Sequence, residues 1–92
     1  MKLPILAQAQ AAVLNREPLY GPARQNFDLI AKRWSLVVGV GVTPEQVALM
    51  LIDLKLARLS HDPTHVDSII DVAGYAACLD AINRPYPPLD VE

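Results

Sequence analysis

The sequence is poor in cysteine and glycine and has no excess of basic residues. Its one cysteine, Cys78, cannot form an intramolecular disulfide, which favours a reducing, cytoplasmic setting. The four glycines are scattered and match no phosphate-binding loop. A formal net charge of -2 provides no basic stripe for a phosphate backbone. We therefore expect no nucleic acid polymer as a partner, although a single phosphate group remains possible.

Long hydrophobic runs are also missing. The apolar stretch near the N-terminus is shorter than a signal-peptide core, and the later stretches are broken by glycine, proline or aspartate well before the ~18 residues of a membrane span. The length of 92 residues fits one domain. A mean hydropathy of +0.24 is high for so small a monomer, because small domains leave much of their surface exposed. We expect a cytoplasmic homo-oligomer with no membrane segment.

The hydrophobic periodicity predicts an all-α protein, a compact bundle of four helices. Two helices are expected over about Pro4–Asn15 and from Pro22 to Val38, and two more from Pro44 to Leu59 and from just after Asp62-Pro63 to about Asn83. The last two form a central antiparallel hairpin. Residues 1–84 make one helical domain, and residues 85–92 are an extended, proline-rich tail.

The third helix has the clearest start signal. Thr43 is suited to the N-cap, Pro44 to the first helical position, and Gln46 to the reciprocal partner of a capping box. On the second helix, Phe27 and Trp34 lie on one apolar stripe and are expected in the core. These signals predict helix boundaries but do not indicate a chemical function.

Four charged residues lie where the hairpin should be apolar: Lys55 and Arg58 on its first helix, Asp67 and Asp71 on its second. With equal rise on both helices, Lys55 faces the stretch from Asp67 to Asp71, and Arg58 comes level with Asp67. One interpretation is a set of structural ion pairs that fixes the register of the helices. The other is a phosphate site, in which Lys55 and Arg58 bind an anion and the two aspartates hold a magnesium ion.

An ordered series of residues resembles a known family of small phage and prophage proteins, catalogued only as a domain of unknown function. The series comprises Tyr20-Gly21, Asn26-Phe27, Ile30-Ala31, Trp34-Ser35, the motif TPEQVALM, Lys55, Ala57-Arg58 and the motif DSIIDVAGYAA. At a greater distance, it is similar to the MazG-like all-α nucleotide pyrophosphohydrolases. The first resemblance implies a phage protein that acts in the infected bacterial cell. The second implies magnesium, held here by Asp67 and Asp71 as catalytic residues, and a nucleoside triphosphate as substrate.

The sequence departs from the pyrophosphohydrolase pattern at the third helix. Those enzymes carry acidic pairs on both core helices, whereas this chain has Lys55 and Arg58 at the corresponding positions. The departure favours nucleotide binding by Lys55 and Arg58 without turnover, for example as a sponge for a cyclic or modified nucleotide that signals in host immunity. Candidates for contacts with the base or sugar are Tyr20, Asn26, Trp34 and Tyr75. A purely structural or partner-binding phage protein is the third alternative.

Overall fold

The computed structural model describes residues 2–84, which form four α-helices and no strand. The helices are α1 (Pro4–Tyr20), α2 (Ala23–Val38), α3 (Pro44–His61) and α4 (Val66–Asn83). The all-α prediction is therefore confirmed for this part of the chain, and the tail at residues 85–92 lies outside it. Among the described residues, no helix is long and apolar enough to cross a membrane.

The first helix is longer than the sequence predicts. It continues past Asn15 to Tyr20, with Pro18 inside it, and ends at Gly21, whose φ of 79° is in the left-handed region. Proline costs the helix one hydrogen bond. However, Arg16 and Glu17 are good helix formers, and Arg16 is on the same helical face as the packed residue Val13, three positions earlier. The predicted end of this helix at about Asn15 is wrong for this reason.

The ends of α2 and α3 follow the local signals. After Val38, Gly39 adopts the left-handed conformation with φ 77° and its N–H donates to the Ser35 carbonyl. At the start of α3, the Thr43 hydroxyl accepts from the Gln46 amide at 3.1 Å, and the Gln46 side chain accepts from the Thr43 amide at 2.9 Å. The predicted capping box is confirmed.

The start of α4 lies later in the chain than the sequence predicts. The Asp62 carboxylate accepts hydrogen bonds from the Thr64 amide and hydroxyl, at 3.1 and 2.7 Å, and so is used within the turn. The N-cap is His65, whose Nδ1 accepts from the Ser68 amide at 3.3 Å. Consequently α3 extends to His61 and α4 begins at Val66, three residues after Pro63.

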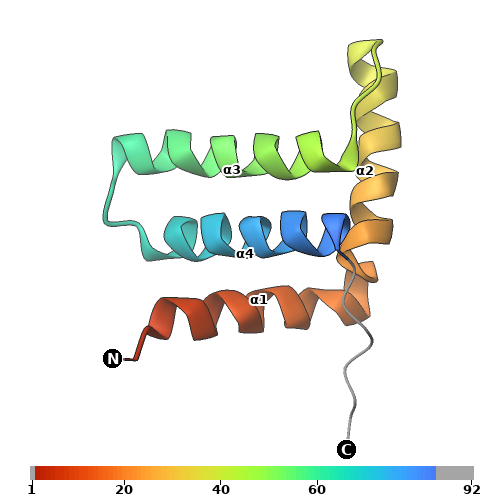
Figure 1. The fold of residues 1–92 in the computed structure, drawn as a ribbon. Coiled ribbons are helices and arrows are strands. Elements are labelled where there is room, and N and C mark those ends of the chain that lie inside the picture. The colour runs from red at the N-terminus through yellow and green to blue at the C-terminus, as the bar shows by residue number, and fades with distance from the viewer. Residues whose placement is uncertain (1, 85–92) are drawn as a thin grey trace, which may run out of the picture.

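Three helices lie side by side in one layer, with α4 between α1 and α3, and α2 crosses one end of the layer (Figure 1). The molecule measures 45 by 42 by 21 Å. A core of six residues forms where α2 meets α3 and α4: Phe27, Ala31, Val47, Ala48, Cys78 and Ile82, with Trp34 packed against it. Phe27 and Trp34 thus belong to the core, as the sequence predicts.

Candidate functional site

Lys55 and Asp71 join α3 to α4. The Lys55 Nζ lies 2.9 Å from Asp71 Oδ2, and the two side chains are 12% and 34% exposed. The register argument predicts this meeting from the sequence, and the distance confirms it. Because the lysine is the more buried partner, the ammonium depends on Asp71 more than the carboxylate depends on Lys55.

The second predicted pair, Arg58 with Asp67, is not formed in the described part of the chain. Both residues are exposed, and no ion pair joins them. The reason is the later start of α4, which places Asp67 in the first turn of that helix. There its carboxylate complements the positive end of the helix dipole instead of an arginine. The expected cluster of two cations and two carboxylates is thus one ion pair with two exposed neighbours.

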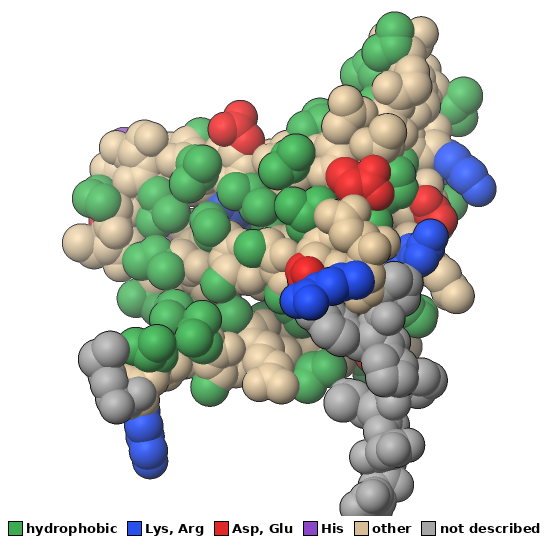
Figure 2. All heavy atoms as spheres, viewed as in Figure 1, with side chains coloured by type: hydrophobic (Ala, Val, Ile, Leu, Met, Phe, Trp, Pro, Cys, Tyr) green, Lys and Arg blue, Asp and Glu red, His purple; other side chains and the backbone are tan. Residues whose placement is uncertain are grey.

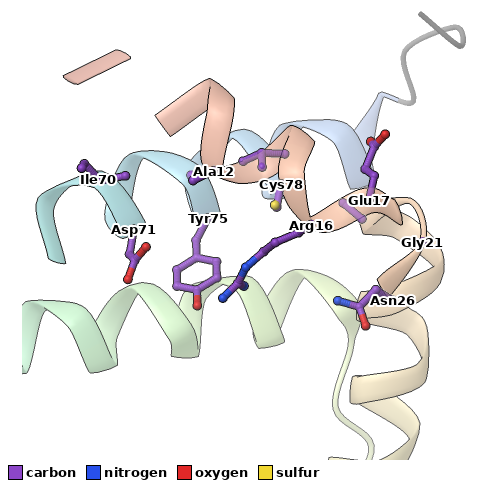
Figure 3. A pocket seen from close by; sticks show the side chains of 12 residues that line it. Ala12, Arg16, Glu17, Gly21, Asn26, Ile70, Asp71, Tyr75 and Cys78 are labelled. Carbon is purple, nitrogen blue, oxygen red and sulfur yellow. The ribbon is translucent and has the colours of Figure 1, made fainter. Parts of the chain in front are cut away.

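A small cavity of about 50 Å³ opens beside the ion pair, between α1, α4 and the start of α2. Figure 3 shows the side chains of Asp71, Tyr75 and Arg16 in a row along it, with Asn26 at the end nearest α2. Its polar residues are Arg16 and Glu17 from α1, Asn26 from α2, and Asp71 and Tyr75 from α4. The apolar part of its wall includes Ala12, Val13, Ile70, Gly74 and Cys78.

The cavity brings together three of the residues singled out from the sequence, Asn26, Asp71 and Tyr75, and adds two that were missed. The sequence predicts that the first helix ends before Arg16 and Glu17, whereas the extension of α1 carries both residues to the cavity. The spacing of Ala9, Val13 and Arg16, at offsets of four and seven, is the signal that could have placed Arg16 on the packed face. Tyr20 is the last residue of α1, and its side chain lies outside the described part of the structure.

Cys78 lies at the inner wall of the cavity. Burial raises the pKa of its thiol above the usual value, and the charges of Arg16 and Glu17 act on it in opposite directions. A raised pKa keeps the thiol protonated near neutral pH and lowers its reactivity. We therefore assign Cys78 to the wall of the cavity.

The predicted magnesium ligands lie in the first half of α4. Asp67 and Asp71 are one turn apart on α4, and Asp71 already binds Lys55. Within residues 2–84, no three His, Cys, Asp or Glu side chains are grouped closely enough to hold a metal ion. Magnesium is often held by one or two carboxylates together with substrate phosphates and water. The two aspartates suit a magnesium ion that is held partly by substrate phosphates and water. They do not suit a site in which protein side chains alone surround the ion.

Comparison with known proteins identifies the family. Residues 4–83, which span all four helices, match the Domain of unknown function (DUF6378). The Gene 55 protein of Mycobacterium phage L5 is 43% identical over 67 residues, covering 72% of this chain and 43% of that protein. The Gene 55 protein of Mycobacterium phage D29 is 37% identical over 79 residues, covering 85% of this chain and 52% of that protein.

The chain spans about half the length of these curated relatives, whose names state no activity. No solved structure matches. The phage-family resemblance seen in the sequence is confirmed, whereas no pyrophosphohydrolase similarity is shown by these matches. Since the family match covers nearly the whole described chain, this protein belongs to the DUF6378 family, whose function is unknown.

Proposed function

We propose that this chain binds a phosphorylated nucleotide at the cavity between α1, α4 and the start of α2. The observation that carries the proposal is the row of Asp71, Tyr75 and Arg16 along one small opening (Figure 3). A guanidinium binds phosphate through charge-assisted, often bidentate hydrogen bonds. A tyrosine ring provides a stacking surface and a hydroxyl for a base or sugar.

The size of the cavity limits what it can hold. Pockets that enclose a whole drug-sized ligand measure roughly 300–1,000 Å³, whereas this one measures about 50 Å³. One phosphate or the edge of a base could enter, and the remainder of the nucleotide would lie on the surface. Arg58 is exposed three residues beyond Lys55 and is suited to an outer phosphate. Lys55 would contribute only if the phosphate competes with Asp71 for its ammonium.

Binding without turnover is favoured, because metal-assisted hydrolysis of a triphosphate needs several carboxylates to hold the metal ions. The polar lining carries one arginine against Glu17 and Asp71, and Asp71 is paired with Lys55. A protein of this kind could sequester a cyclic or modified nucleotide in the cytoplasm of the infected cell.

A magnesium-dependent pyrophosphohydrolase is the second candidate, favoured by the one-turn spacing of Asp67 and Asp71. In that case the two carboxylates would hold magnesium, whose charge would stabilise the phosphates. A third candidate, a structural or partner-binding protein, is favoured by the short Lys55–Asp71 distance. It requires no ligand at the cavity.

Isothermal titration calorimetry against ATP, GTP, cyclic dinucleotides and ADP-ribose, with magnesium and with EDTA, tests the proposal. We expect heat from at least one compound, and a loss of affinity of ~10- to 150-fold in Arg16→Gln, as for a charge-assisted hydrogen bond. Arg33→Gln, on the exposed side of α2, is the matched control. If no compound of the panel produces heat, the binding proposal is wrong. Release of pyrophosphate from ATP or GTP would favour the pyrophosphohydrolase instead.

A further inference from the structure

The surface of this protein is richer in large apolar side chains than its core. Among the residues whose burial the structure describes, seven hydrophobic residues are buried, and the largest fully buried hydrophobic side chain is Val47. Fifteen large hydrophobic residues are exposed. Contiguous exposed apolar patches beyond a few hundred Å² are rare on soluble monomers and mark interaction sites. The distribution of these residues over the layer therefore indicates where another molecule docks.

Part of this apolar surface forms one face of the α1–α3–α4 layer. On α4, Ile69 lies about 160° around the helix from Asp71, and so points away from the cavity. α1 runs along one edge of α4, and α3 runs along the other edge (Figure 1). The rotation of side chains around each helix then brings six exposed residues to the side of the layer on which Ile69 lies: Leu3, Leu6, Leu49, Leu56, Val66 and Ile69. Figure 2 shows hydrophobic side chains over all three helices on the side that it views. These six residues define the apolar face.

The six residues of the apolar face are uncharged, and charged side chains lie around them (Figure 2). The residues between the six, on the exposed side of α4, include Ala73 and Ala76. At the rim, the Asp80 carboxylate is paired with Arg84 at 2.6 Å, so that this pair adds no net charge. In a two-fold interface each charge near the axis meets its own copy, and like charges repel. A face without central charge suits self-association, whereas it offers a foreign charged partner nothing to recognise.

The accessible surface of the whole chain is also large for its mass. The accessible surface of the chain is 6899 Å², whereas a compact monomer of this mass exposes roughly 5,300 Å². This excess of roughly 1,600 Å² belongs to the whole surface of the chain, and one partner contributes ~800 Å² to a standard interface. We infer that a second copy of this chain covers the apolar face, so that two α1–α3–α4 layers stack face to face and leave both nucleotide cavities on the outside.

Sedimentation velocity at micromolar concentration tests the inference, with Leu56→Asp and Ile69→Lys as variants on the apolar face. The parent protein should sediment at 20 kDa or a higher even multiple of the protomer mass, which is 10.1 kDa. Each variant should sediment as a monomer with the parent's helical circular dichroism, because both residues are already exposed in the protomer. Leu36→Asp, at an 84% exposed residue of α2, is the control and should remain associated.

Three results would overturn the inference. One is a parent protein that sediments at 10 kDa. Another is dissociation by Leu36→Asp with both face variants still associated, which would move the interface to α2. The third is an unfolded face variant whose milder replacements, Leu56→Ser and Ile69→Ser, fold and remain fully associated. None of these measurements involves a nucleotide, so they are independent of the proposed function.

Discussion

The Lys55 ammonium and the Asp71 carboxylate, 2.9 Å apart, are unequally buried, with the lysine side chain at 12% exposure and the aspartate at 34%. This asymmetry predicts unequal costs of truncation. Asp71→Leu leaves a nearly buried ammonium without its carboxylate, and should lower the free energy of unfolding by ~2 to 4 kcal/mol. Lys55→Met leaves a carboxylate that water reaches, and should cost ~1 kcal/mol or less. Urea denaturation of both variants measures the difference.

The double variant Lys55→Met/Asp71→Leu separates an ion-pair lock from a binding site. Replacing both charges with apolar groups of similar size is often neutral or stabilising. We therefore expect the double variant to be within ~1 kcal/mol of the parent protein. If the double variant retains full nucleotide affinity, the pair is structural and plays no part in binding. If Lys55→Met is the costlier single change, the assigned asymmetry is wrong.

The capping box at the start of α3 makes a local prediction. Thr43→Ala removes the hydroxyl that accepts from the Gln46 amide, and should destabilise the protein by ~1 kcal/mol. Ser60→Ala is the control, because the Ser60 hydroxyl donates back to the Leu56 carbonyl within the helix, an interaction that adds little. Thermal denaturation of the two variants should show a clear fall in Tm for the first alone. Equal shifts would contradict the capping assignment.

Features set by neighbouring residues could be predicted from the sequence, and features set by the packing of distant ones could not. Thr43 and Gln46 are three residues apart, so the cap depends on local geometry alone. Lys55 and Asp71 are separated by a short turn, and helical rise is enough to bring them together. A small error in the turn is also enough to separate Arg58 from Asp67, because each residue of offset rotates a side chain by about 100°.

The cavity could not be predicted because it depends on α1. The sequence at Arg16–Gly21 contains Pro18 and Gly21, both of which favour a turn. The helix continues through Pro18 and ends at Gly21, because packing of Val13 and Arg16 along α4 outweighs the lost hydrogen bond of proline. The arrangement of three helices in a single layer likewise follows from long-range contacts. Hydrophobic periodicity reports on single helices and does not predict such contacts.

Cys78 supplies a chemical probe of the cavity. Burial raises the pKa of its thiol, so its alkylation by iodoacetamide at pH 7.5 should be slow relative to the same reaction in urea. Because the folded pKa lies above the unfolded one, stability should fall as pH rises above about 9, where only the unfolded thiol ionises. Cys78→Ala should lose this alkaline dependence.

Occupancy of the cavity should slow the alkylation further. Cys78 lines the same cavity as Arg16 and Tyr75, so a compound of the calorimetry panel that binds there must restrict access to the sulfur. The comparison uses mass spectrometry of the intact protein with and without that compound at saturation. An unchanged rate in the presence of a compound that binds by calorimetry would place its site elsewhere on the molecule.

A substitution at Gly74 should affect the stability of the protein and ligand binding at the cavity in opposite directions. It is a buried residue in the interior of α4, and a Cβ there would meet Val13 Cγ2 at 3.5 Å, an ordinary contact. Gly74→Ala should therefore raise the free energy of unfolding by ~0.5 to 1 kcal/mol, because glycine is a poor helix former. The same methyl group narrows the cavity that Gly74 lines, and should weaken binding of the nucleotide.

The control for this change is Gly41→Ala, where the added Cβ meets nothing within 4 Å and φ is not in the left-handed region. That variant should bind like the parent protein and be equally or slightly more stable. Chemical denaturation and calorimetry on the same preparations provide both readouts. A Gly74→Ala protein that is more stable and binds less tightly supports a site at the cavity. One that is more stable with unchanged affinity would show that the nucleotide does not enter it.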